Sequence, residues 1–411
     1  MTSPVLEGFG SPAGNPAATR GGLTGAGVRE RWKMSMDSRA LVLVTVVLIA
    51  LGLVVLYSAS ALSALEAGDP PHGFMLKQAQ GVLVGIVFFA FGAKVDAERW
   101  RKWAWPLMAL SIVAMLITLL PSKQEIGGSR RFLMGGSIQP SEFAKLAVIL
   151  WTPMLLVKKG PALRRLGKGL GPFLVVIGVL CTIAMLQPDL SMAMTYCLLM
   201  AVILFAGGAR TAHFVFLGIL AVPLLVQQIS KREYIVQRIE VFFAKDAVGD
   251  SKPAPMAYQQ QQSLIAIGSG GLVGVGFGEG QQQAGWTPLA YNDFIASVVG
   301  EEFGFLGMSV LVFAFALYAW LGFRIARSAR TPFQSLVAIG LTYATVITAF
   351  VHLGVTIDLL PNTGLTLPFV SFGRSNLVLT MLMTGILVNI GSVRERRYGS
   401  GATDPFASGA G

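Results

Sequence analysis

The chain has 411 residues, of which 54% are hydrophobic and only 13% are charged. A soluble globular protein has roughly 25% charged residues, so this composition, together with long apolar runs, excludes a soluble protein and predicts a polytopic membrane protein. The net charge of +11 would suggest a nucleic-acid partner in a soluble protein. In a membrane protein, the distribution of Lys and Arg is explained first by the orientation of the loops across the membrane. No nucleic-acid partner is therefore expected.

Apolar segments of the length of a bilayer crossing occupy most of the chain. A helix needs about 20 apolar residues to cross the hydrocarbon core. The sequence therefore predicts an all-α polytopic membrane protein with about ten transmembrane helices. The expected spans are 40–61, 78–93, 104–120, 142–157, 170–187, 190–206, 211–228, 299–323, 333–357 and 374–393. Residues 1–38 and 396–411 are rich in small and polar residues and are expected to be disordered cytoplasmic tails on a transmembrane domain at 39–395.

Basic residues alternate along this series of spans. Most of the 32 lysines and arginines lie in the two tails and in the joints after every second span. The positive-inside rule then places both termini in the cytoplasm. By the same rule, one large extracytoplasmic loop, about 229–298, connects helices seven and eight. Cys181 and Cys197 fall within apolar segments and are interpreted as core residues.

The first notable outward joint precedes the fourth span. Ser141, after Pro140, is the expected N-cap of this span. Glu142 and Lys145 follow at i, i+3 spacing, so they share a helix face. A charged pair so close to lipid is either self-neutralising or faces a polar cavity.

Two further outward joints carry turn residues and polar side chains. Pro188 is expected to force the joint between the fifth and sixth spans, where Asp189 is expected to cap the following helix. The joint at 358–373 has two prolines and two glycines within an apolar stretch. Such a segment is tolerated at membrane depth only where protein or a water-filled cavity satisfies its backbone, which predicts a broken segment lining a cavity.

The large loop ends in a carboxylate, Asp293, where the chain re-enters the bilayer. Taken alone, this residue is either a helix N-cap or a reactive group at the membrane surface. Glu301 and Glu302 follow within the next span and are expected to stabilise the helix and hold the loop. Local polar contacts are the expected role of His352 and Asp358.

Motifs along 40–395 resemble those of the SEDS family (shape, elongation, division and sporulation), which includes FtsW and RodA. The motifs are Tyr57-Ser58-Ala59-Ser60, Arg130-Arg131 with Gln139-Pro140-Ser141-Glu142 and Lys145, Gln187-Pro188-Asp189, Gln262-Ser263 with Ala266-Ile267-Gly268-Ser269-Gly270-Gly271, Asp293-Phe294-Ile295 with Gly300-Glu301-Glu302, and Leu360-Pro361, Gly364, Leu367-Pro368 and Ser371. The resemblance implies a ten-helix glycosyltransferase of the bacterial cytoplasmic (inner) membrane that polymerises lipid II into peptidoglycan. It also implies a class B penicillin-binding protein as partner, together with other membrane proteins of the division or elongation complex.

The resemblance also implies roles for individual residues. Asp293 matches the essential aspartate of the family and is the expected general base, taking a proton from the acceptor sugar hydroxyl. The diphosphate leaving group needs cationic help, from basic side chains or from a divalent cation. The implied substrate-binding residues are Arg130, Arg131, Glu142, Lys145, Arg238, Gln262, Ser263 and Ser371.

The chain departs from the family pattern around this site. Gln283 stands where the family has Lys, Leu289 where it has Glu, and Arg374 within its Ser-Tyr-Gly-Gly-Ser-Ser motif. These departures predict altered contacts beside Asp293, or a specialised or weakly active member. For Arg374 at the start of the last span, snorkelling to lipid headgroups is expected.

Several functional alternatives remain. The Val299-Gly300-Glu301-Glu302 motif and the long N-terminal tail favour a division (FtsW) role in septal wall synthesis, whereas 267–271 also suits a RodA-type role in elongation and cell shape. A lipid II flippase would instead have charges near span centres and internal repeats, and no repeat is evident here. A non-catalytic scaffold of the division complex is the third alternative, because the site departs from the family.

Overall fold

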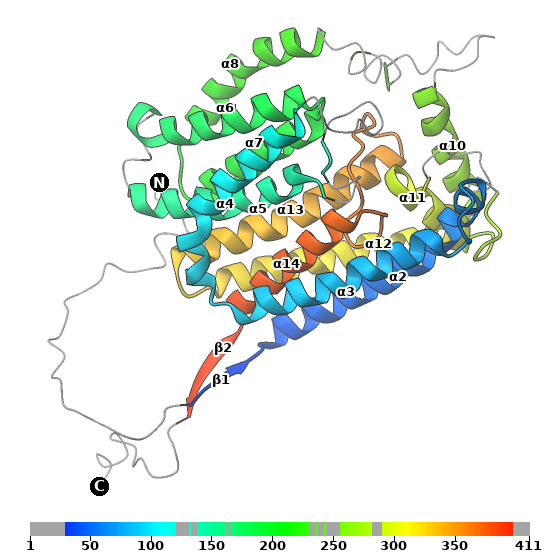
Figure 1. The fold of residues 1–411 in the computed structure, drawn as a ribbon, viewed down its shortest axis with the longest axis horizontal. Coiled ribbons are helices and arrows are strands. Elements are labelled where there is room, and N and C mark those ends of the chain that lie inside the picture. Colours follow the sequence, from blue (N-terminus) through cyan, green and yellow to red (C-terminus); the bar gives the residue numbers. More distant parts are fainter. Residues whose placement is uncertain are drawn as a thin grey trace, which may run out of the picture.

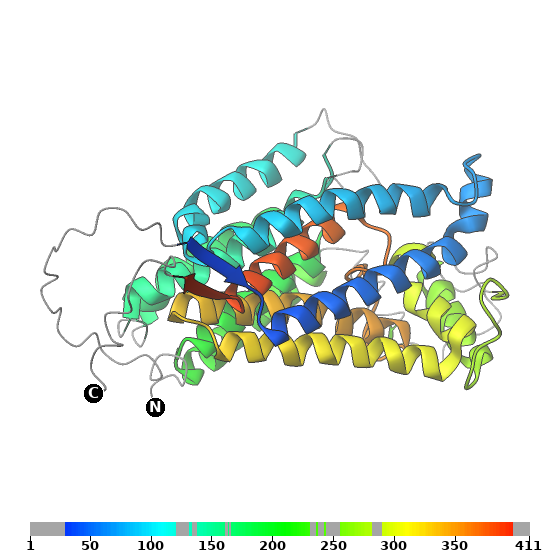
Figure 2. The same cartoon turned by 90° about the horizontal axis from the view of Figure 1, so that it is seen from below.

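The architecture was determined from a computed structural model of the chain. It describes residues 29–120, 131–133, 138–160, 163, 166–230, 236, 242–243, 255–281 and 290–397. Long helices run side by side along one main direction, and the two short strands lie at one end of this bundle (Figure 1). The helices α10 and α11 lie at the opposite end, as a second view confirms (Figure 2).

In the part of the chain that the structure describes, ten long helices overlap the ten expected spans. They are α2 (Met36–Glu66), α3 (Gly73–Lys94), α4 (Ala97–Thr118), α5 (Pro140–Lys159), α6 (Gly171–Leu186), α7 (Leu190–Ala206), α8 (Thr211–Ser230), α12 (Ile295–Arg327), α13 (Pro332–Thr356) and α14 (Arg374–Ile390). A π-helix, η2 (Leu166–Leu170), precedes α6. Within the large loop lie α10 (Pro255–Gly270) and α11 (Ala290–Asp293), which the sequence analysis did not predict.

Five of the described helices are long and apolar enough to cross a membrane, namely α2, α3, α5, α12 and α13. Shorter apolar helices are α6, α7 and α14. The apolar stretch of α5 is almost entirely buried inside the protein, and most of the apolar stretch of α13 is buried too. The apolar stretch of α3 is mostly exposed. The bundle therefore has α5 and α13 at its centre and apolar surface on its outside, as expected of a polytopic membrane protein.

Small residues bring α3 against α14. A Cβ on Gly92 would overlap Leu382 O, and a Cβ on Gly385 would overlap Phe89 O, so the two backbones approach closely. Gly81 and Gly85, at the spacing of a small-xxx-small motif, face Leu377 and Met381 of α14. This glycine seam joins the second and the last of the ten helices.

The two ends of the described chain form an antiparallel ribbon. β1 (Arg29–Lys33) pairs with β2 (Val393–Arg397), in a register that sets Glu30 opposite Arg396 and Arg31 opposite Glu395. The described structure begins at residue 29 and extends to 397, slightly beyond the expected domain at 39–395. Disorder of the tails stays a prediction, because residues 1–28 and 398–411 lie outside the described chain.

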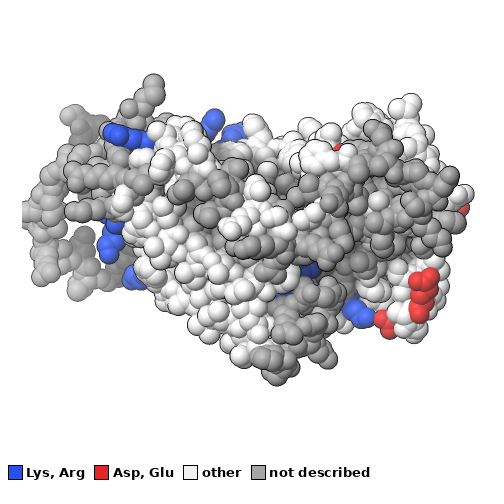
Figure 3. Space-filling model, turned by 90° about the horizontal axis from the view of Figure 1, so that it is seen from above, with Lys and Arg blue, Asp and Glu red and all other residues white. Residues whose placement is uncertain are grey.

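Charge is distributed unevenly along the bundle. On the face shown in Figure 3, the Lys and Arg side chains of the described residues lie mainly towards the ribbon end. The Asp and Glu side chains visible on this face lie mainly towards the opposite end. The middle of this face is largely uncharged. We call the end with α10 and α11 the outer end, in keeping with the predicted topology.

The helix α12 is interrupted near its start. Gly304 has φ 63° and ψ −159°, which breaks the helical hydrogen-bond pattern around it. Residues 271–278, here called the glycine loop, fill the break. Val275 N and Gly276 N donate to Glu301 O and Glu302 O, and Phe305 N and Leu306 N donate to Gly271 O and Leu272 O, at 2.9–3.1 Å.

The buried side chains of Glu301 and Glu302 bind the backbone at the C-terminal end of the glycine loop and just after it. Glu302 Oε1 accepts a hydrogen bond from Gly278 N at 3.1 Å and another from Ser58 Oγ of α2. Glu301 Oε1 accepts one from Gln281 N at 2.9 Å. The expectation that these two residues hold the loop agrees with this geometry.

Gly274→Ala is expected to destabilise the outer end of the protein. The residue has φ +86°, and an added Cβ would overlap the backbone at Glu302, so the glycine loop would have to leave the break in α12. We expect a lower midpoint of thermal unfolding in detergent. The matched control is Gly268→Ala in α10, where a Cβ meets nothing within 4 Å. Equal unfolding midpoints for the two variants would contradict this role of the loop.

Candidate functional site

Asp293 lies at the junction of two helices at the outer end. It ends α11, and α12 begins at Ile295 after Phe294, which occupies the N-cap position without a side-chain cap. Asp293 is therefore not the N-cap of α12. Its side chain is half-buried, and Oδ2 would lie 4.0 Å from a Cβ placed on Gly364. Burial raises the pKa of neighbouring Tyr291, and the negative charge of Asp293 adds to this shift.

The broken segment, residues 357–373, supports the chain just before Asp293. Ser371 Oγ accepts a hydrogen bond from Leu367 N at 2.8 Å and donates one to Asn292 O at 2.7 Å. Phe372 N donates to Tyr291 O at 3.0 Å. Ser371 thus fixes the position of Asp293 through the backbone, while a contact between Ser371 and substrate stays a prediction.

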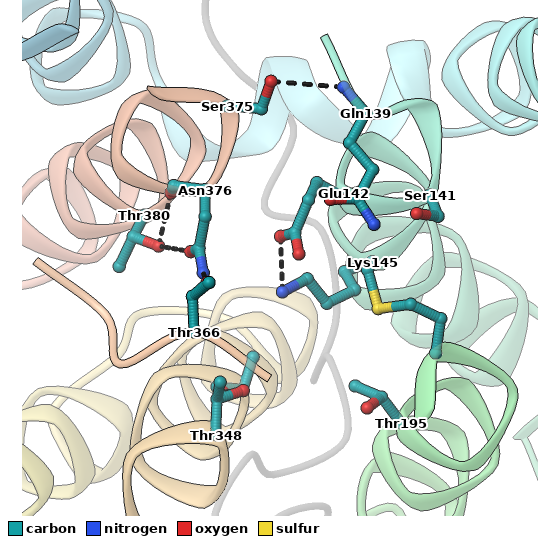
Figure 4. A network of polar contacts seen from close by, with 12 residues as sticks. Gln139, Ser141, Glu142, Lys145, Thr195, Thr348, Thr366, Ser375, Asn376 and Thr380 are labelled. Atoms are coloured by element: carbon teal, nitrogen blue, oxygen red, sulfur yellow. Dashed lines mark hydrogen bonds and ion pairs between the residues drawn. The ribbon is translucent and has the colours of Figure 1, made fainter. Parts of the chain in front are cut away.

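Glu142 and Lys145 form an ion pair in the interior of the bundle. Lys145 Nζ lies 2.5 Å from Glu142 Oε2, and only 4% and 7% of the two side chains are exposed. Both point from α5 into the space between α5 and the helices α13 and α14 (Figure 4). Charges in such a place must be paired, because desolvation of an isolated charge is costly. The predicted shared face is confirmed.

Arg131 and Asp189 bring two outward joints together. Asp189 Oδ1 caps α7 by accepting a hydrogen bond from Met192 N at 3.2 Å, as predicted. Its Oδ2 lies 3.7 Å from Arg131 Nη1 and 3.5 Å from Gln139 Nε2. Burial raises the pKa of Asp189, and the Arg131 charge opposes this shift. This pairing was not predicted, because the two residues lie in different joints.

The start of α5 differs from the prediction. The N-cap is Gln139, with Pro140 at the first helical position, so the assignment of Ser141 as N-cap is wrong. Pro suits that position because its fixed φ matches the helix and its missing N–H would be unpaired there anyway. The carbonyl of Ser141 instead accepts a hydrogen bond from Tyr196 Oη at 2.8 Å, which ties α5 to α7.

The broken segment passes from one helix to the next around this region. Thr363 O accepts from Ser191 Oγ of α7, and Leu365 O lies 2.8 Å from His352 Nδ1 of α13. Thr366 Oγ1 accepts from Asn376 Nδ2 of α14, close to the buried ion pair in Figure 4. One continuous segment therefore links the surroundings of Asp293 with those of Glu142 and Lys145. The local polar contact expected of His352 is confirmed.

Several buried polar atoms in this region have no hydrogen-bond partner among the described residues. They belong to the starts of α5 and α7, the junction before Asp293, the end of α13 and the broken segment. These atoms are Arg131 Nε, Ser141 Oγ, Gln187 Oε1, Asn292 Oδ1, His352 Nε2 and Thr363 Oγ1. Buried polar atoms are normally satisfied, so donors and acceptors here suit a polar ligand or water.

The remaining residues that the sequence singled out lie either on described helices or outside the described residues. Ser263 of α10 is buried and donates to Thr356 O at 2.9 Å, which attaches α10 to the end of α13; Gln262 beside it is half-buried. Arg130, Arg238, Gln283 and Leu289 lie outside the described residues, and their roles stay predictions. Arg374 begins α14, and its Cγ faces Gly81 of α3.

The sequence matches a known family over almost all of this architecture. The model of the FtsW/RodA/SpoVE family, described as cell cycle protein, matches residues 39–396. The chain belongs to the FtsW/RodA/SpoVE family. This region agrees with the transmembrane domain expected at 39–395, and it includes Asp293, the buried ion pair and the broken segment.

Relatives within the FtsW/RodA/SpoVE family are similar over nearly their whole length. A probable peptidoglycan glycosyltransferase FtsW of Trichlorobacter lovleyi is 34% identical over 366 residues, covering 88% of this chain and 95% of the relative. The stage V sporulation protein E of Bacillus subtilis is 34% identical over 371 residues, covering 89% and 99%.

Solved structures of the family share the fold. One is a chain from work on the structural coordination of polymerization and crosslinking by a peptidoglycan synthase complex, with a TM-score of 0.71, 26% identity and coverage of 86% of this chain and 97% of that chain. The rod shape determining protein RodA of Thermus thermophilus has a TM-score of 0.62 and 25% identity, with coverage of 86% and 95%.

Proposed function

We propose that this protein is a peptidoglycan glycosyltransferase that polymerises lipid II into glycan strands, with Asp293 as the general base. The observation that carries the proposal is the position of Asp293, fixed at the outer end of the bundle by the broken segment, in a chain that belongs to this family. Full-length relatives named as probable peptidoglycan glycosyltransferases support the activity.

The geometry suits attack by a sugar hydroxyl at the membrane surface. A carboxylate within hydrogen-bond reach takes the proton as the hydroxyl attacks the anomeric carbon, and the diphosphate leaves with increased negative charge. Arg131 suits the diphosphate better than Lys145 does. Its side chain is 34% exposed and its Nε has no hydrogen-bond partner in the described part of the chain, whereas Lys145 is buried against Glu142.

A divalent cation at the diphosphate remains part of the proposal. Among the described residues there is no group of three or more His, Cys, Asp or Glu that would hold a metal by itself. Mg²⁺ is commonly held by one or two carboxylates together with substrate phosphates, so a cation here would depend on the bound diphosphate. It would supply positive charge to the leaving group.

The proposal includes a topology and partners. Ten spans with both termini in the cytoplasm of the inner membrane are supported by the ten helices and by the gathering of basic residues at the ribbon end. The structural likeness to a chain of a peptidoglycan synthase complex supports a class B penicillin-binding protein as partner. A septal role in division is supported by the FtsW relatives at 33–34% identity, compared with 25% for the RodA structure.

The test is polymerisation of purified lipid II by the purified full-length chain, with and without its class B partner, read as glycan polymer on a denaturing gel. We expect polymer in the presence of the partner. No polymer under either condition, from protein that unfolds cooperatively, would refute the activity and favour a flippase or a scaffold. Translocation of labelled lipid II in proteoliposomes would then separate these two alternatives.

A further inference from the structure

We propose that the glycine loop, residues 271–278, is immersed in the acyl chains of the outer leaflet and anchors the outer end of the protein at a fixed depth. Its side chains are unusually apolar for a surface loop. Leu272 and Val273 are each 73% exposed, Val275 is 45% exposed and Phe277 is 48% exposed. No charged residue occurs from Pro255 to Gly278. Clustered exposed apolar side chains mark an interaction surface.

This surface continues the apolar outside of α12. Leu306, Val310 and Phe313 are 56%, 60% and 67% exposed and recur at i, i+4 and i+7, so they form one stripe on the helix. The backbone hydrogen bonds of Phe305 and Leu306 set Gly271 and Leu272 against the outer end of that stripe. The stripe belongs to a helix long and apolar enough to cross a membrane, so the same acyl chains would cover both.

The length of α12 fixes the depth of the loop. The helix is uncharged from Phe303 to Phe323 and meets its next charge at Arg324, whose guanidinium lies 4.6 Å from the centre of the Trp320 ring. About 20 residues span the hydrocarbon core of roughly 30 Å, and Trp and Arg are typical of its boundary. The outer boundary therefore lies near Phe303, where the glycine loop is hydrogen-bonded.

Charge marks the point where the chain leaves the hydrocarbon. Glu279 is the first charged residue after the loop, and its side chain is exposed. The backbone before and after it is held by the carboxylates of Glu302 and Glu301. The loop is therefore a preformed apolar surface with a polar border, and its continuity with the lipid-facing stripe of α12 favours acyl chains over a partner protein as its occupant.

The anchor would set the height of Asp293, a consequence that rests on the proposed function. The loop is hydrogen-bonded to Glu301 and Glu302, and the helical residues from Ile295 to Phe303 connect this contact to Asp293. Asp293 precedes Ile295 by two residues, so the depth of the loop would help to set the depth at which Asp293 meets a sugar attached to a lipid diphosphate. The immersion itself follows from the apolar surface and does not depend on catalysis.

Site-directed spin labelling tests the immersion directly. The label is attached at Val273→Cys in the full chain, in lipid nanodiscs without a partner protein, with the free thiols of Cys181 and Cys197 replaced by Ala. Collision with oxygen and with a water-soluble nickel chelate is compared by power saturation. The matched controls are Val310→Cys on the lipid-facing stripe and Glu279→Cys at the polar border.

We expect the oxygen-to-nickel accessibility ratio at Val273 to resemble that at Val310 and to exceed that at Glu279 severalfold. A ratio like that at Glu279 would refute immersion, and low access to both reagents would mean that protein, not lipid, covers the loop. Leu272→Cys repeats the measurement if the first variant does not fold. Since no step uses lipid II, failure here is distinct from failure of the proposed activity.

Discussion

Asp293→Asn is expected to lower the rate of lipid II polymerisation by roughly 10²- to 10⁴-fold, the usual contribution of a general base. Asn has nearly the same shape as Asp and keeps hydrogen-bonding capacity, but it cannot take the proton of the acceptor hydroxyl. The backbone supports from Ser371 and Phe372 do not involve the side chain of Asp293, so folding should be preserved. The measurement is polymer formation per unit time at saturating partner.

The control for this prediction is Asp69→Asn, which removes another carboxylate from the joint between α2 and α3. Asp69 pairs with Lys77 at 2.8 Å, and 40% of its side chain is exposed, so this ion pair contributes roughly 1 kcal/mol or less. Its loss should leave polymerisation unchanged. Normal polymer from Asp293→Asn would remove the general-base role, whereas equal losses in both variants would point to a general effect of removing negative charge.

Neutralising one member of the buried pair Glu142–Lys145 is expected to destabilise the protein by about 3–5 kcal/mol. Lys145→Met leaves a carboxylate in the interior of the bundle, and Glu142→Gln leaves an ammonium there, because both side chains are almost fully buried. The double variant Glu142→Gln/Lys145→Met has no buried charge at either position. It should regain most of the lost stability in thermal unfolding.

The double variant also separates a structural role from a substrate contact. If the pair only neutralises itself, polymerisation returns together with stability. If either charge contacts substrate, the double variant folds but its polymerisation stays low. Single variants as stable as the wild type would contradict the cost of an unpaired buried charge.

The helices were predictable because apolar length is a local property of the sequence. Each of the ten expected spans falls on a helix, although α12 begins at Ile295, four residues before its predicted start. The break at Gly304 was not predictable, since its backbone groups are hydrogen-bonded by the glycine loop, which belongs to a separate segment of the chain. The β ribbon was missed for a related reason, because its strands come from opposite ends of the chain.

The parts of the site that depend on local sequence spacing were also predictable. The i, i+3 spacing of Glu142 and Lys145 placed them on one helix face, and the structure pairs them. The capping role of Asp189 followed from its position after Pro188. Its contact with Arg131, and the link from Ser371 to Asn292, join segments whose separation in sequence carries no information about distance in space.

The glycine seam between α3 and α14 has a consequence for how the protein is made. Gln78 of α3 and Ser371, just before α14, are hydrogen-bonded at 3.0 Å across 293 residues. Translation proceeds at about 5–20 residues per second, so α3 waits roughly 15–60 s in the membrane before its partner is synthesised. During that interval its glycine face lacks the helix that it packs against in the folded protein, and the seam stays open until the last helix has been synthesised.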